Sequence, residues 1–117
     1  MNEQRCTVLV RRRAGSLDPG LDEHSEYLPC EVCGKYAKNL ERHHRQFRSR
    51  GGLWVPSNIL LLCPVCHLSA TEEREWTREY GMNVSERQVP EEVPVKLWHE
   101  PRMVCLHDDG SFTPAIL

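Results

Sequence analysis

Two pairs of closely spaced cysteines constrain the fold of this chain more than any other feature of its sequence. Cys30 and Cys33 form the segment CEVC, and Cys63 and Cys66 form the segment CPVC, with 29 residues between the pairs. Four thiolates in two such pairs supply the ligands of one tetrahedral zinc ion, each at about 2.3 Å from the metal. Gly34 follows the first pair, where a tight turn favours a positive φ. The spacing therefore predicts a structural zinc site that joins two distant parts of the chain.

The small size of the chain is a reason to expect a metal site that stabilises the fold. The chain has 117 residues, of which 39% are hydrophobic, and this predicts one small domain with a thin core. Domains of this kind often need a metal ion or disulfides for stability. The zinc site is therefore expected to hold the fold together.

The apolar segments and the cysteines indicate a cytoplasmic protein. The N-terminal apolar run has five residues, too few for the core of a signal peptide, and no run approaches the roughly 20 residues of a membrane span. Six cysteines in the cytoplasm predict thiols or metal ligands and no disulfides. Cys6 and Cys105 lie outside the two pairs, and we interpret them as small hydrophobic residues.

We expect three segments along the chain. Residues 1–27 form an N-terminal arm, with a short strand at residues 6–10. Residues 28–82 form the zinc-held core. Residues 83–117 form a linker followed by a hairpin of two short strands, with candidate strand segments at residues 95–98 and 102–106 and an Asp-Gly turn signal at residues 109–110.

Within the predicted core, two strands and a helix follow one another. Residues 39–47 and 58–63 read as strands, and residues 48–57 read as the loop between them. The segment after the second cysteine pair is helical in character up to Gly81, a credible residue after a helix C-terminus. Trp76 and Tyr80 are spaced to lie on one face of this helix.

Charge is distributed unevenly around this core. The net charge of −2 does not indicate a nucleic-acid-binding protein. Residues 35–50, however, contain six basic residues and one acidic residue, whereas residues 67–92 contain seven acidic and three basic residues. The basic segment includes two adjacent histidines, His43 and His44, in the sequence ERHHRQFRSRGG.

Four polar residues of the core are expected to converge in a hairpin followed by a helix. His43 and His44 lie in the first strand, Asn58 begins the second, and His67 directly follows the last cysteine of the two pairs. Adjacent residues of a strand point to opposite faces, so the two neighbouring histidines are expected to have different roles.

These segments resemble the HNH nuclease family. The resemblance rests on CEVCGK, ERHHRQFRSRGG, SNILLLCPVCH and VCLHDDGSFTPA, and it covers about residues 28 to 115. The last segment makes the chain most similar to the small HNH proteins of actinobacterial phages and prophages, which would place it in the host cytoplasm. The resemblance implies an α+β fold: a small zinc-stapled, treble-clef-like ββα-metal domain with an N-terminal arm and a C-terminal β-hairpin.

The resemblance also implies a reaction and roles for individual residues. The reaction is metal-dependent hydrolysis of DNA phosphodiester bonds, which nicks or cuts double-stranded DNA. His44 is implied as the general base, held by a backbone carbonyl, and Asn58 as the residue that fixes the loop between the strands. His43 and His67 are implied as ligands of one catalytic divalent cation (magnesium, manganese or nickel), distinct from the structural zinc.

DNA is the partner that the resemblance implies, together with packaging proteins in a phage setting. Arg45, Arg48 and Arg50 are expected to contact DNA phosphates, although a solvated face explains Arg48 and Arg50 as well. Gly51 and Gly52 are expected to let the loop turn tightly near the DNA.

One departure from the family pattern opens an alternative function. The family usually has a second histidine one helical turn after the first, and this chain has Thr71 there. A threonine hydroxyl is a poor ligand for a divalent cation, so we expect the neighbouring Glu72 or water to fill the position. The alternative is a catalytically weakened, zinc-stapled module that binds DNA or assists phage packaging. A RING-type interaction module would need eight zinc ligands, which the histidines do not complete.

Overall fold

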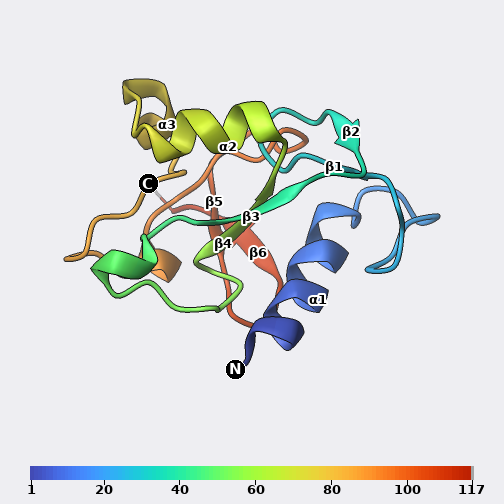
Figure 1. The fold of residues 1–117 in the computed structure, drawn as a ribbon, viewed down its shortest axis with the longest axis horizontal. Coiled ribbons are helices and arrows are strands. Elements are labelled where there is room, and N and C mark those ends of the chain that lie inside the picture. Colours follow the sequence, from blue (N-terminus) through green and yellow to red (C-terminus); the bar gives the residue numbers. More distant parts are fainter. Residues whose placement is uncertain (117) are drawn as a thin grey trace.

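A β-hairpin between two helices forms the centre of the protein in the computed structural model, which describes residues 1–116 (Figure 1). No helix in this range is long and apolar enough to cross a membrane. The elements, in chain order, are α1 (Glu3–Ala14), β1 (Leu28–Pro29), β2 (Tyr36–Ala37), β3 (Glu41–His44), the 3-10 turn η1 (Arg48–Arg50), β4 (Ile59–Leu62), α2 (Pro64–Thr71), α3 (Glu75–Glu79), the 3-10 turn η2 (Pro90–Glu92), β5 (Val104–Leu106) and β6 (Phe112–Pro114).

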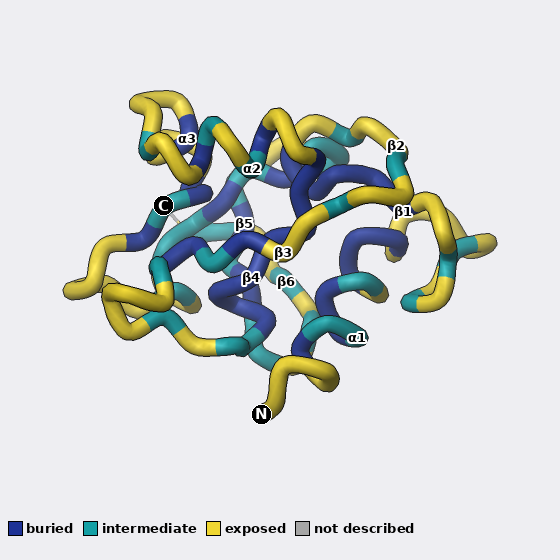
Figure 2. Tube along the Cα trace, viewed as in Figure 1, coloured by how far each residue is buried: buried dark blue, intermediate teal, exposed yellow. Residues whose placement is uncertain are grey.

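The β3–β4 hairpin confirms the two strands that the sequence predicts in the core. The strands are antiparallel, and His43 and His44 lie opposite Leu60 and Ile59. All four residues of β4 are buried because the strand lies between two apolar clusters. Alternate residues of a strand point to opposite faces, so β4 serves both clusters and needs apolar residues throughout. Figure 2 shows the buried trace at the centre and exposed loops around it.

The two clusters divide the core between the two ends of the chain. One cluster joins β4 to α1 and β1 and consists of Cys6, Val10, Ala14, Leu28, Ile59 and Leu61. The other joins β4 to the cysteines, α2 and the C-terminal part, with Leu60, Leu62, Met82, Val95, Leu97, Val104 and Leu106 among its members.

The prediction of a strand at residues 6–10 is wrong, because this segment belongs to helix α1. The side chain of Asn2 caps the helix by accepting a hydrogen bond from the Arg5 backbone N–H at 2.7 Å. Cys6, Val10 and Ala14 recur every four residues, so they form one apolar face, and this face packs on β4. Helix α1 is therefore part of the folded core.

A buried ion pair ties α1 to the first cysteine pair. The guanidinium of Arg13 donates to both carboxylate oxygens of Glu31, at 2.8 and 2.9 Å, and both side chains are almost fully buried. Arg13 also donates to the carbonyl oxygens of Pro56 and Ile59. Because all these groups are buried, loss of either partner would leave an uncompensated charge in the core.

The predicted helix after the second cysteine pair is two helices. Helix α2 ends at Thr71, and α3 begins at Glu75. Glu73, between them, has a φ of +50°, a backbone conformation that a continuous helix does not contain. The contact between Trp76 and Tyr80 is confirmed, with edge-on rings whose centroids lie 5.5 Å apart.

A C-terminal hairpin is present, and its two strands are β5, within the segment predicted at residues 102–106, and β6, which follows the Asp-Gly turn; the segment predicted at residues 95–98 forms no strand. Gly110 has a φ of +91° in the turn between them. The segment before β5 adds only the single bridge between Val95 and Val104. The predicted linker is packed against the core, since Val84 is buried and its backbone N–H donates to the Arg45 carbonyl at 2.8 Å.

Candidate functional site

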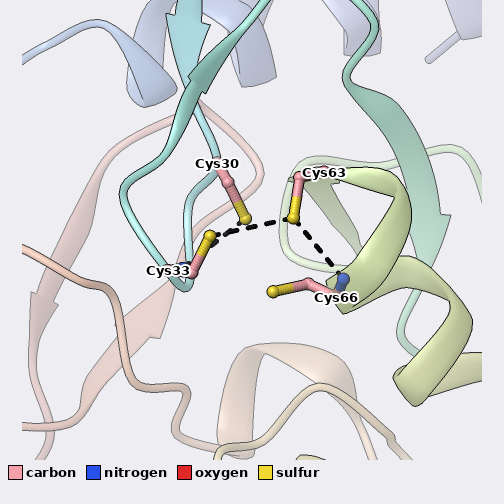
Figure 3. A group of neighbouring side chains, drawn as sticks. All are labelled: Cys30, Cys33, Cys63 and Cys66. Atoms are coloured by element: carbon pink, nitrogen blue, oxygen red, sulfur yellow. Dashed lines mark hydrogen bonds between the residues drawn. The ribbon is translucent and has the colours of Figure 1, made fainter.

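Four cysteine side chains meet between the β1–β2 turn and the start of α2. The sulfur atoms of Cys30, Cys33, Cys63 and Cys66 all lie within 4.8 Å of one another, and the side chains point toward a common centre (Figure 3). The sulfurs of Cys33 and Cys63 are 3.7 Å apart. Bonds of about 2.3 Å to a tetrahedral zinc ion place its sulfur ligands about 3.8 Å apart. The cysteines therefore fit a structural zinc ion.

Backbone geometry holds each cysteine pair in place. The N–H groups of Cys33 and Cys66 lie 3.5 Å from the sulfurs of Cys30 and Cys63, respectively, and point toward them. Gly34 has a φ of +80°, and a Cβ atom there would also lie 2.8 Å from the Trp98 ring. The predicted need for glycine after the first pair is therefore confirmed.

A second group of polar side chains surrounds an open hollow of about 330 Å³ beside the β3–β4 hairpin. Strand β3, the turn that follows it and α2 supply the lining. This brings together three of the histidines that the sequence analysis singled out, along with two arginines. The lining residues are Arg42, His43, His44, Phe47, Arg48, Ser49, His67 and Thr71.

His43 is buried at the inner side of this hollow, with 2% of its surface exposed. Its Nε2 atom lies 2.7 Å from the Met82 carbonyl oxygen. A carbonyl only accepts hydrogen bonds, so Nε2 carries the proton and Nδ1 keeps a free lone pair. Burial lowers the pKa of His43 to about 4, despite the opposing hydrogen bond to Met82. The imidazole is therefore neutral at pH 7, the form that binds metal ions.

His67 is held in the same way by a carboxylate. Its Nδ1 atom lies 2.8 Å from Oε1 of Glu41, which leaves Nε2 free. The rings of His43 and His67 are edge-on, with centroids 5.3 Å apart. Metal-binding histidines usually donate their second ring N–H to a carbonyl or carboxylate. Both imidazoles show this arrangement, so each has one ring nitrogen tied to an oxygen and one left free.

His44 differs from the expectation that a backbone carbonyl holds its ring. Within residues 1–116, its buried Nε2 atom has no hydrogen-bond partner. The ring instead packs edge-on against Trp54, with centroids 4.3 Å apart. Burial lowers the pKa of His44, and the guanidinium groups of Arg48 and Arg42 lower it further. A neutral imidazole next to a polar hollow is suited to accept a proton.

Asn58 joins the two sides of the loop between β3 and β4. Its side-chain oxygen accepts from the Gln46 N–H at 2.7 Å, and its side-chain nitrogen donates to the carbonyls of Gln46 and Leu53 at 3.1 Å. Gly52 makes this possible, because a Cβ atom there would lie 1.7 Å from the Gln46 carbonyl oxygen. Gly51, with a φ of +90°, makes the turn itself.

The predicted DNA contact of Arg45 is wrong. Arg45 is fully buried, and its guanidinium donates only to backbone carbonyls. Those carbonyls belong to Ser57, Gly81, Pro90 and Val93. With its side chain fully buried and all three nitrogens bonded inside the protein, Arg45 cannot reach a phosphate. It fixes the segment after α3 against the end of β3.

The other three arginines of the basic segment, at positions 42, 48 and 50, differ in their surroundings. Arg48 is exposed at the hollow, as a phosphate contact requires. Arg50 is paired with Glu73, at 2.8 and 3.1 Å. Arg42 also lines the hollow, and the sequence analysis did not single it out.

Thr71 faces the hollow, as its place one turn after His67 predicts. Its hydroxyl donates to the His67 backbone carbonyl at 2.9 Å. Glu72 is exposed and directly follows the last residue of α2. It pairs with Arg74 at 3.2 Å and does not line the hollow. In the described part of the chain, the four cysteines are the one group of three or more potential ligands close enough to share an ion.

Glu41 and the Met82 carbonyl are hydrogen-bond partners of the site histidines that the sequence analysis missed. Glu41 had a detectable signal, because it lies two residues before His43 and therefore on the same face of a strand. The Met82 carbonyl had none, since 39 residues separate the two groups.

The site thus combines a four-cysteine cluster with a hairpin braced by Asn58 and a hollow lined by histidines. Residues 30–73 match the sequence model of the HNH endonuclease family. This HNH segment contains all four cysteines, the three histidines of the hollow and Asn58. Helix α1 and everything after Glu73 lie outside the match, so the resemblance of the C-terminal hairpin stays a prediction. Comparisons with curated proteins and with solved structures gave no match.

Proposed function

We propose that the protein is a metal-dependent endonuclease that hydrolyses phosphodiester bonds of double-stranded DNA. The observation that carries the proposal is the histidine hollow. His43 and His67 each have one ring nitrogen tied to an oxygen and one free, and His44 stands beside them with Arg42 and Arg48. The match of residues 30–73, which include these histidines, to the HNH endonuclease family model supports this chemistry.

Each residue of the hollow has a role in this proposal. Nδ1 of His43 and Nε2 of His67 would hold a divalent cation such as magnesium, manganese or nickel. The cation, when bound, polarises the scissile phosphate and stabilises the departing oxygen. His44 takes a proton from water, and the water oxygen bonds to phosphorus. The bond from phosphorus to the 3′ oxygen then breaks, and this oxygen takes a proton from solvent.

A plasmid assay tests the proposal directly. Purified zinc-loaded protein is incubated with supercoiled plasmid and a panel of magnesium, manganese and nickel. We expect relaxed or linear DNA that depends on the added cation. If the DNA stays supercoiled with every cation, the enzyme function is refuted.

The basic rim of the hollow predicts how binding depends on salt. Arg42 and Arg48 are expected to neutralise phosphates, so each change to alanine should reduce the slope of log K against log salt by about 0.9. Filter binding or anisotropy at several salt concentrations measures the slope. Arg12→Ala is the matched control, because Arg12 lies on α1, pairs with Glu23 and does not line the hollow. If the variant with both Arg42→Ala and Arg48→Ala shows an unchanged slope, DNA binds elsewhere.

The position of Thr71 predicts a gain of function. Thr71→His adds an imidazole one turn after His67, facing the same hollow. Imidazole suits later transition metals such as nickel better than magnesium. We expect tighter nickel and manganese binding by calorimetry and faster nicking with those ions, with a smaller gain for magnesium. The matched control is Leu68→His, at an exposed position of α2 that does not line the hollow. Identical cation titrations for the natural protein and Thr71→His would show that this position does not reach the cation.

A second candidate function is a zinc-stapled module that binds DNA, or assists phage packaging, without efficient cleavage. One observation favours it: the Thr71 hydroxyl is directed to its own helix, so two protein ligands are left for a catalytic cation. DNA binding without cleavage in the plasmid assay would support this candidate.

A further inference from the structure

The side chain of His44 presents an unusual feature that its proposed catalytic role does not explain. Its Nε2 atom is buried, and no hydrogen-bond partner for it lies within residues 1–116. Buried polar atoms in folded proteins nearly always have a partner, so an exception needs a physical reason.

Trp54 supplies a candidate partner for this nitrogen. The planes of the two rings make an angle of 74°, and their centroids are only 4.3 Å apart. In such an edge-to-face pair, the electron-rich face of an aromatic ring can accept an N–H group.

The position of Trp54 is itself fixed by neighbouring groups. The guanidinium of Arg42 lies over the indole at 4.7 Å from the ring centroid. Arg42 in turn donates to Glu3 and Thr7 of α1, at 3.0 and 2.9 Å. The indole also packs against the apolar cluster around α1 and β4. A ring held in this way can orient its neighbour.

We propose that Trp54 is a positioning residue for His44. Its indole face accepts the Nε2–H of His44, which fixes that tautomer and leaves Nδ1 bare to take the proton from water. The inference rests on the proposed endonuclease function, in which His44 is the general base. It gives the tryptophan the role that the sequence analysis assigned to a backbone carbonyl.

The test reads the tautomer directly by nitrogen NMR. In ¹⁵N-labelled, zinc-loaded protein at a pH where His44 is neutral, long-range proton–nitrogen spectra should show Nε2 protonated and Nδ1 bare. Trp54→Phe keeps an aromatic face and should keep this pattern. Trp54→Leu removes the face and should give a mixture of both tautomers. Protonated Nδ1 in the natural protein, or an unchanged pattern in Trp54→Leu, would overturn the proposal.

Nicking rates provide the functional counterpart. Trp54→Leu should lower the cleavage rate at saturating DNA about tenfold, which corresponds to about 1.4 kcal/mol of transition-state stabilisation. Trp54→Phe should restore most of the rate. Trp76→Leu is the matched control, because Trp76 lies on α3 and contacts Tyr80 outside the hollow. Equal rates for Trp54→Leu and Trp54→Phe would also refute the role.

The two proposals fail in different ways. If neither the natural protein nor any variant nicks DNA, the endonuclease function is refuted. The nitrogen spectra then still decide whether Trp54 orients His44. If nicking is normal but the tautomer does not depend on Trp54, only the present inference fails. Thermal melting of each variant separates loss of folding from loss of orientation.

Discussion

Replacing His44 with alanine is expected to reduce DNA nicking by about 10²- to 10⁴-fold, the usual contribution of a positioned general base. The reason is that His44 is the neutral imidazole of the hollow whose ring is not tied to a carbonyl or carboxylate. Relaxation of supercoiled plasmid, followed over time at saturating cation, measures the effect. Because His44 is not a proposed cation ligand, calorimetry should give the same cation affinity for His44→Ala and the natural protein.

Two comparisons make this result specific. His24→Ala removes an exposed histidine that lies before β1, and it should nick DNA at the natural rate. His43→Ala should lose both cation binding and nicking, since its Nδ1 is a proposed ligand. If His44→Ala retains the natural rate, another group takes the proton, and the assignment of the base is incorrect.

Removal of the structural zinc is expected to unfold the protein. Zinc bound by four thiolates contributes on the order of 10 kcal/mol at neutral pH, which matches or exceeds the whole stability of a typical small domain. Cys63→Ser should therefore lack both bound zinc and the native far-UV circular dichroism spectrum. Metal analysis of the natural protein should give one zinc ion per chain, and a strong chelator should abolish the cooperative thermal transition.

Cys105→Ser is the matched control for this change. Cys105 lies in β5, outside the four-cysteine cluster, and is half-buried. Its substitution should leave the zinc content unchanged and lower the melting temperature only slightly. A chelated protein that melts at the natural temperature would show that the cluster does not stabilise the fold.

Parts of the site that depend on local spacing could be predicted from the sequence. The two cysteine pairs determine their own cluster, because each C-x2-C turn places both sulfurs on one side of a short loop. The strand with His43 and His44 and the apolar β4 followed from residue pattern alone. Thr71 was placed correctly because one helical turn separates it from His67.

The errors arose where long-range packing decides the outcome. Residues 6–10 contain valines and a threonine, which favour strands, but packing against β4 stabilises a helix there. The sequence does not distinguish an arginine that binds phosphate from one that serves carbonyls of its own chain. For Arg45 those carbonyls lie between 12 and 48 residues away along the sequence.

The carbonyl that holds His43 has a consequence for the order in which the site forms during synthesis. Proteins are made from the N-terminus, so the HNH segment leaves the ribosome before Met82 and before the segment that Arg45 binds. Until those residues emerge, His43 lacks its oxygen partner and the end of β3 lacks its anchor. In a growing chain, the four cysteines would therefore be available for zinc well before the histidines of the hollow have all their hydrogen-bond partners. Under the proposed function, cleavage of DNA would begin only after the chain has been translated at least as far as Val93.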